Sequence, residues 1–168
     1  AFKPTFILAV PRIFEKIYNA ASQKAGAGFK GRVFADATQT AYDWSHAQQS
    51  GGSIPLALNA KHALYNKLVY SSIMEVFGGH VEYAVSGGAP LDSSIAHFFN
   101  GVGLPLLEGY GMTETCAPSS VNPTEGYKIG TIGLPLQGVT MGVDEEGELC
   151  IKSPAVCAGY HNNPDVTK

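Results

Sequence analysis

The residues best suited to chemistry lie in one short stretch, residues 106–115. An apolar run leads into two glycines that flank Tyr110, and Thr113 and Glu114 follow directly. Glycines let a planar ligand lie against bare backbone, and a tyrosine ring can stack on a base. The threonine hydroxyl can reach a phosphate oxygen, and the carboxylate can bind Mg²⁺, which commonly takes one or two protein carboxylates plus substrate phosphates. This combination would suit a site at which the α-phosphate of a nucleotide is attacked.

Two ordinary structures explain the same residues. A Gly-Tyr-Gly sequence at 109–111 is also typical of a simple tight loop. Thr113 followed by Glu114 is also typical of a helix start with an acid in the first turn. The chain has no Gly-Lys-Ser/Thr phosphate loop to decide the matter. The spacing alone therefore leaves both interpretations open.

The elements predicted around these residues form a strand–helix–strand unit. Residues 81–86 and 104–108 are predicted strands, and each leads into a predicted glycine-rich turn, at 87–90 and 109–111. Asp92 is a good N-cap for the helix between them. A unit of this length implies parallel strands joined by a right-handed crossover. Both turns would then lie at the carboxyl ends of adjacent strands, where open α/β sheets bind ligands.

The first half of the chain is predicted to be mostly helical. A short strand at residues 6–10 precedes a helix that begins at Pro11 and ends at Gly26. A second helix is expected from about residue 31 to 49, and a third, long helix from residue 55 to 77. The apolar stripe of the third helix is predicted to face the core through Leu58, Leu64, Leu68, Ile73 and Phe77.

From about residue 130 the pattern changes to short strands and turns. Residues 139–143 and 148–152 flank an Asp-Glu-Glu-Gly sequence and predict a β-hairpin. We therefore expect an α/β fold, a partial α/β sandwich with parallel strands over residues 1–128, followed by a small all-β part over residues 129–168. The chain starts at Ala1 without a Met, so we expect a segment of a larger protein.

Composition excludes several classes of function. The formal charge is −3, and no basic cluster predicts nucleic-acid binding. No apolar run is long enough to predict a membrane span. The three cysteines have no metal-ligand spacing, and their odd number argues against a disulfide framework, so a reducing cytosol is expected.

Three motifs, in order along the chain, resemble signatures of the adenylate-forming superfamily. Residues 108–115 (Glu-Gly-Tyr-Gly-Met-Thr-Glu-Thr) resemble its Tyr-Gly-x-Thr-Glu signature, and residues 85–91 resemble its adenine-side loop. Residues 147–152 with Gly159-Tyr160 resemble its later Gly-Glu-Leu and Gly-Tyr motif. Residues 10–18 resemble a segment typical of long-chain fatty acyl-CoA synthetases. The resemblance therefore indicates an internal fragment of the large N-terminal domain of such an enzyme, with residues 129–168 beginning its β-barrel subdomain.

The resemblance also implies roles for individual residues. Thr113 would contact the α-phosphate and Glu114 would bind Mg²⁺, so these two are the expected catalytic residues. Tyr110 would stack on the adenine. The full set expected to bind ATP or AMP is Gly88, Ala89, Pro90, Glu108, Gly109, Tyr110, Gly111, Met112 and Thr113. Relatives often have an amide at the position of Glu108.

The implied reaction has two steps. A fatty carboxylate attacks the α-phosphate of ATP to give acyl-AMP and pyrophosphate. The thiol of coenzyme A then attacks the acyl carbonyl, which forms the thioester and releases AMP. The family's phosphate loop, ribose-binding Asp and catalytic lysine do not occur in these 168 residues, so we expect the fragment alone to be inactive. The resemblance implies a cytoplasmic location, with peripheral contact at a membrane as the alternative. Acyl chain length cannot be deduced from these residues.

Other interpretations remain open at this point. One is another adenylate-forming enzyme, such as an aryl-CoA ligase or a peptide-synthetase adenylation domain. Another is a non-catalytic nucleotide-binding or scaffold module. In each case a fragment would expose strand edges and apolar faces, so we expect self-association.

Overall fold

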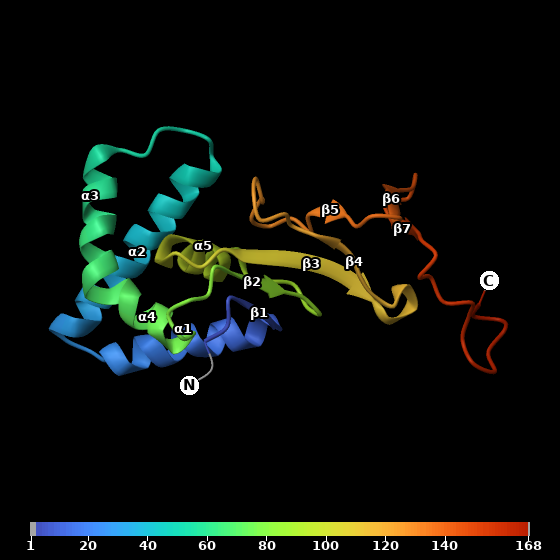
Figure 1. Ribbon diagram of the computed structural model, residues 1–168, viewed down its shortest axis with the longest axis horizontal. Helices are drawn as coiled ribbons and strands as arrows, with labels where there is room; N and C mark the ends of the chain where they lie inside the picture. Colours follow the sequence, from blue (N-terminus) through green and yellow to red (C-terminus); the bar gives the residue numbers. More distant parts are fainter. Residues whose placement is uncertain (1–2, 168) are drawn as a thin grey trace.

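A five-stranded sheet forms the centre of the computed structural model, which describes residues 3–167. The strands lie side by side in the order β1-β2-β3-β4-β5 (Figure 1). Strands β1, β2 and β3 run parallel, whereas β4 pairs antiparallel with both β3 and β5. This arrangement confirms the predicted α/β class with parallel strands. The strands are β1 (Phe6–Ala9), β2 (Tyr83–Ser86), β3 (Leu106–Met112), β4 (Ala117–Val121) and β5 (Leu134–Pro135).

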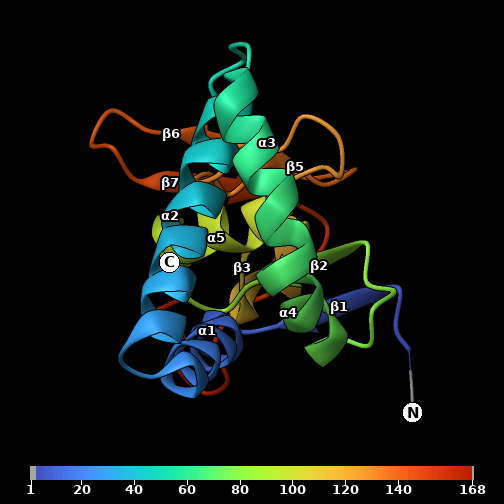
Figure 2. The same cartoon turned by 90° about the vertical axis from the view of Figure 1, so that its left-hand side faces the viewer.

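Helices make both crossovers between the parallel strands. Four of them, with a π-helical segment, lie between β1 and β2, and α5 (Ser93–Val102) joins β2 to β3. The helices gather toward one end of the molecule in Figure 1, and Figure 2 shows α2 and α3 side by side above α1. The segments before β2 are α1 (Pro11–Ala25), α2 (Phe29–Gln49), α3 (Leu56–Tyr65), the π-helical η1 (Asn66–Tyr70) and α4 (Ser71–Val76).

The core lies between the helices and one face of the sheet. Phe14 of α1 and Phe99 of α5 are both fully buried, with ring centroids 5.8 Å apart in an edge-to-face arrangement. Burying a large apolar side chain contributes roughly 1.5–3 kcal/mol. Phe6 and Leu8, which alternate with inward-facing residues of β1, are exposed. The helices therefore cover one face of β1 and leave the other open.

Helix α5 is fixed at both ends by features that the sequence encodes. The carboxylate of Asp92 accepts from the backbone N–H of Ser94 at 2.7 Å, which confirms the predicted N-cap. Near the other end, a Cβ added to Gly101 would lie 2.1 Å from the carbonyl oxygen of Ala41 in α2. The backbones of α2 and α5 therefore approach too closely for any side chain at this position.

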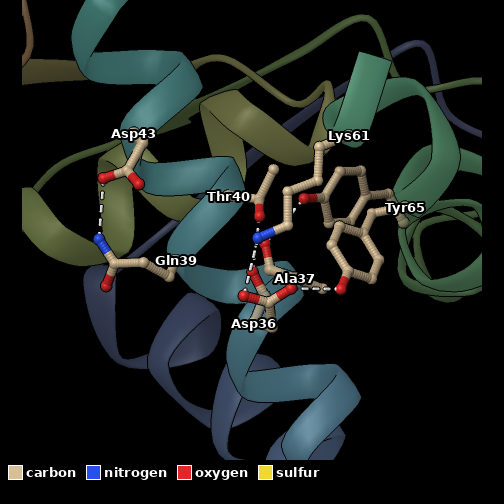
Figure 3. A network of polar contacts seen from close by, with 8 residues as sticks. Asp36, Ala37, Gln39, Thr40, Asp43, Lys61 and Tyr65 are labelled. Atoms are coloured by element: carbon tan, nitrogen blue, oxygen red, sulfur yellow. Dashed lines mark hydrogen bonds and ion pairs between the residues drawn. The ribbon is translucent and has the colours of Figure 1, made fainter. Parts of the chain in front are cut away.

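A polar network connects α2 to α3 and η1 (Figure 3). The Lys61 ammonium lies 2.8 Å from one carboxylate oxygen of Asp36, and the Tyr65 hydroxyl donates to the other. Lys61 and Tyr65 together hold the pKa of Asp36 below its usual value. Because the ion pair is exposed, it contributes only about 0–1 kcal/mol. The buried Tyr70 hydroxyl also donates to the Ala37 carbonyl at 2.7 Å, so the connection continues beneath the surface.

The predicted core stripe of the third helix is wrong at two positions. Leu64 and Leu68 are 55% and 61% exposed, whereas Tyr70 and Ile73 are buried. Leu64 lies in α3, before the π-helical η1, and faces outward there, whereas Leu68 lies inside η1. The π-helical turn contains more residues than an α-helical turn, so a stripe counted at constant period does not continue through η1, where Tyr70 is the buried residue.

The predicted turn at residues 109–111 is also wrong, because these residues are inside β3. The first half of β3 pairs with β2, and the second half pairs with β4, beginning with Gly109 opposite Val121. A Cβ added to Gly111 would lie 2.1 Å from the carbonyl oxygen of Ala117. The glycines therefore allow close strand pairing, and the register shifts between Tyr110 and Gly111.

The last part of the described chain contains the predicted hairpin. Strand β6 (Thr140–Val143) pairs antiparallel with β7 (Leu149–Lys152). Within residues 3–167 the strands close no barrel. Strand β5 belongs to the central sheet although it lies beyond residue 128, and the division at 128 and 129 stays a prediction. No helix between residues 3 and 167 has the length and apolar character needed to cross a membrane.

Candidate functional site

A cleft of about 840 Å³ lies at the carboxyl ends of the three parallel strands. Its volume falls within the range of small-molecule sites. Strand β4 adds a wall beside these ends, because it runs antiparallel along the second half of β3. The lining residues are Leu8, Ala9, Val10, Val85, Ser86, Gly87, Gly88, Gly109, Tyr110, Gly111, Met112, Thr113, Ala117, Pro118, Val121 and Leu136.

The cleft brings together most of the residues that the sequence singled out. Residues 87–88, in the glycine-rich loop after β2, line the cleft together with the second half of β3. The predicted residues that line the cleft are Gly88, Gly109, Tyr110, Gly111, Met112 and Thr113. The predicted residues that do not line it are Ala89, Pro90, Glu108 and Glu114.

Glu108 contacts the glycine-rich loop directly. One oxygen of its carboxylate accepts from the backbone N–H of Leu91 at 3.1 Å, across from β3 to the end of the loop. Its backbone carbonyl accepts from the backbone N–H of Asn122 at 3.0 Å. Glu108 therefore holds the loop and the segment after β4 against β3. A role of Glu108 toward adenine stays a prediction.

Thr113 and Glu114 begin a short 3₁₀ turn, η2 (Thr113–Thr115), directly after β3. The hydroxyl of Thr115 closes this turn by accepting from the backbone N–H of Met112 at 3.2 Å. The side chain of Thr113 is exposed and lines the cleft, so its hydroxyl is available to a ligand. This turn thus places Thr113 at the lining of the cleft, with Glu114 directly after it and outside the lining.

The carboxylate of Glu114 has a partner far along the chain. The Tyr160 hydroxyl donates to it at 2.7 Å, and the backbone N–H of Cys157 donates to the Glu114 carbonyl at 2.7 Å. The phenol's hydrogen bond lowers the pKa of Glu114, and the same bond raises the pKa of Tyr160. Glu114 is therefore held in its ionised form, as a metal ligand must be.

The site can provide only part of a metal coordination shell. In the part of the chain that the structure describes, no group of three or more His, Cys, Asp or Glu side chains is placed to hold a metal ion. A single ionised carboxylate fits Mg²⁺ only if phosphate oxygens and water supply the other ligands. The residues present are therefore compatible with a cation that arrives with a nucleotide.

Sequence reasoning missed the residues that β4 brings to the cleft. Ala117, Pro118 and Val121 line it because β4 folds back on β3, and no motif indicated that pairing. It also assigned no role of its own to Ser86, whose hydroxyl is buried at the cleft and has no hydrogen-bond partner among the described residues. The two glycines of β3, which were predicted to form a turn, are a signal that could have indicated this close strand pairing.

Comparison with known sequences gives consistent relatives. Over 166 residues, the chain is 45% identical to the protein named long-chain-fatty-acid–CoA ligase FadD15 of Mycobacterium bovis, covering 99% of this chain and 28% of the relative. It is 31% identical to long chain acyl-CoA synthetase 5 of Arabidopsis thaliana, covering 99% of this chain and 26% of the relative. The chain thus spans about a quarter of the length of these relatives.

Comparison with solved structures and with protein families supports the fold. A malonyl-CoA ligase in complex with methylmalonyl-CoA and AMP matches 97% of this chain and 27% of its own, with a TM-score of 0.58 and 20% identity. The A-PCP didomain of a carboxylic acid reductase from Segniliparus rugosus, bound to AMP, matches 98% of this chain and 20% of its own, with a TM-score of 0.53 and 22% identity. The family described as AMP-binding enzyme matches residues 1–161, and the chain therefore belongs to the AMP-binding enzyme family.

Proposed function

We propose that this chain is part of an AMP-forming long-chain fatty acid–CoA ligase and forms the adenylate-binding half of its active site. The observation that carries the proposal is the cleft, which gathers the glycine-rich loop, Tyr110 and Thr113 at the carboxyl ends of parallel strands. The similarity to proteins named as long-chain acyl-CoA synthetases and ligases supports the substrate class.

Five residues of the cleft have a chemical task in this proposal. The bare backbone of Gly88 and Gly109 admits a flat adenine ring, on which the ring of Tyr110 stacks. The hydroxyl of Thr113 donates to an α-phosphate oxygen, where negative charge develops as the fatty carboxylate attacks. Met112 borders the carboxylate that is activated. The thiol of coenzyme A then attacks the acyl carbonyl of acyl-AMP, which forms the thioester and releases AMP.

Glu114 would hold the Mg²⁺ that accompanies ATP. When bound, the cation stabilises negative charge on the phosphate oxygens. The contribution of this chain is to keep the carboxylate of Glu114 ionised and fixed. The Tyr160 hydroxyl does both, because it donates a hydrogen bond to that carboxylate at 2.7 Å and lowers its pKa. Magnesium dependence of the parent protein is part of the proposal.

The test uses the full-length protein and variants at Tyr110. Base stacking on an aromatic ring contributes roughly 1–3 kcal/mol. We therefore expect Tyr110→Ala to raise the KM for ATP about tenfold or more, while Tyr110→Phe, which keeps the ring, stays close to the unchanged protein. Formation of AMP is measured with palmitate and, as a comparison, with benzoate. Preference for benzoate would favour an aryl-CoA ligase, and no adenylate with any acid would refute the proposal.

A further inference from the structure

The backbone that follows β3 is strained at two consecutive residues. Cys116 has a φ of 53° and Ala117 has a φ of 91°. A positive φ brings the Cβ of an L-residue too close to its own backbone, so it is common for glycine and rare for other residues. Among the described residues 3–167, the one other residue of this kind is Asn162, whose short amide side chain tolerates such a conformation. Strain of this sort persists only where surrounding contacts hold the backbone in place.

The hydroxyl of Thr115 holds the backbone at both ends of this turn. Its oxygen accepts from the backbone N–H of Met112 at 3.2 Å. Its proton is shared between the carbonyl oxygens of Met112 at 3.1 Å and Ala117 at 3.0 Å. Thr115 is 5% exposed, so water cannot readily replace these bonds. One buried side chain thus joins the last residue of β3 to the first residue of β4.

The two candidate catalytic residues, Thr113 and Glu114, lie inside the loop that Thr115 closes. The backbone N–H of Cys116 donates to the Thr113 carbonyl at 3.1 Å, so a strained residue and a candidate catalytic residue are joined directly. Without the hydroxyl of Thr115, relaxation of Cys116 and Ala117 toward negative φ would displace Thr113 as well. The side chain of Thr113 lines the cleft and that of Thr115 does not, so Thr115 can affect a ligand there only through its neighbours.

We propose that Thr115 is a positioning residue for adenylate formation, which acts by fixing the place of the Thr113 hydroxyl at the lining of the cleft. This role rests on the proposed function, because it is the reaction at the α-phosphate that needs this hydroxyl in place. Preorganised donors stabilise charge that develops in a transition state, and a small misplacement removes much of that effect. Thr115 itself touches no substrate.

Variants of Thr115 in the full-length protein test the role of its hydroxyl. Thr115→Val keeps the shape of the side chain and removes the hydroxyl, whereas Thr115→Ser keeps the hydroxyl. Adenylate formation is measured as palmitate-dependent exchange of pyrophosphate into ATP. Because a misplacement of about 1 Å can cost about 100-fold in rate, we expect kcat to fall about 10- to 100-fold in Thr115→Val. The KM for ATP should change less than about threefold, since a group needed only in the transition state affects kcat more than KM. Thr115→Ser should stay close to the unchanged protein.

A matched control separates positioning from a loss of stability. Thr40 is 2% exposed, and its hydroxyl donates to the Asp36 carbonyl at 2.7 Å, within α2 and outside the cleft. Thr40→Val therefore removes a buried threonine hydroxyl by the same substitution. We expect Thr40→Val to lower the melting temperature and to leave kcat unchanged. All variants are assayed well below their own melting temperatures.

A double variant tests whether Thr115 acts through Thr113. Thr113→Ala alone should lower kcat, and adding Thr115→Val should lower it little further, because groups that act as a unit are not additive. Thr115→Ala also lacks the hydroxyl and is smaller, so it provides the same comparison where the valine variant does not fold.

Each of three results would overturn the role of Thr115 alone. They are a Thr115→Val protein as active as Thr115→Ser, an equal loss of kcat in Thr40→Val, and independent, multiplicative losses in the double variant. No adenylate from the unchanged protein with any acid is a different result, which would refute the proposed function and this role with it.

Discussion

The contact between α2 and α5 leads to a sharp prediction for Gly101→Ala. In an unobstructed helix this change stabilises by roughly 1 kcal/mol, because alanine has the higher helix propensity. Here the new Cβ would lie 2.1 Å from the Ala41 oxygen and 2.5 Å from the Ala41 carbonyl carbon, both backbone atoms that cannot rotate away. The two helices must separate by more than an ångström, and overpacking of this kind costs about 1–3 kcal/mol or more. Because both clashing atoms are backbone atoms, we take the upper end of that range, about 3 kcal/mol, and subtract the propensity gain of roughly 1 kcal/mol. We therefore expect a net destabilisation of about 2 kcal/mol.

Urea unfolding of the purified chain measures this effect. Trp44, the only tryptophan, is a suitable probe because it lies on α2 with its ring stacked on His62 at 4.4 Å. The control is Gly52→Ala, where nothing lies within 4 Å of the added Cβ. We expect this control to be close to neutral. A Gly101→Ala chain as stable as the unchanged chain, or more stable, would refute the close approach of α2 and α5.

Three further predictions concern individual side chains. Asp92→Ala removes the cap that accepts from Ser94 and should lower the free energy of unfolding by about 1 kcal/mol, measured by urea titration. Tyr160→Phe removes a hydrogen bond and should raise the pKa of Glu114 toward 4.5, measured by carboxyl NMR; an unchanged pKa would contradict the contact. Burial lowers the pKa of His97 below 6.5 in the folded chain. The stability that neutral His97 contributes is therefore present above pH 6.5 and is lost as the pH falls through the lowered folded pKa. A His97→Gln chain should lose this pH dependence of the free energy of unfolding.

The parallel part of the fold was predictable because its signals are local. A strand, a glycine-rich loop, an N-cap at Asp92 and a second strand occur in order, and a crossover of that length has only one common geometry. This geometry places the carboxyl ends of the strands at one edge of the sheet, and the cleft lies at that edge. The residues at those ends could therefore be predicted without information on distant contacts.

The errors arose where distant backbone decides the structure. Residues 109–111 were predicted as a turn because two glycines follow an apolar run, yet β4 returns along them and extends β3. The third helix was given a constant period, yet η1 interrupts it and brings Tyr70 inside, where its hydroxyl bonds to the Ala37 carbonyl. A buried partner on another helix cannot be deduced from the period of one helix.

The glycines of β3 therefore serve the sheet before they serve a ligand. A side chain at Gly111 would collide with the Ala117 carbonyl at 2.1 Å, whereas one at Gly109 would meet the Ser120 carbonyl at 3.2 Å and need only a small adjustment. Gly111 is therefore required for β4 to pair closely with β3, and that pairing builds a wall of the cleft. Because the wall exists, Tyr110, which lies between the two glycines, is held at the lining of the cleft. A motif whose spacing indicates nucleotide chemistry thus owes much of its spacing to the geometry of strand pairing.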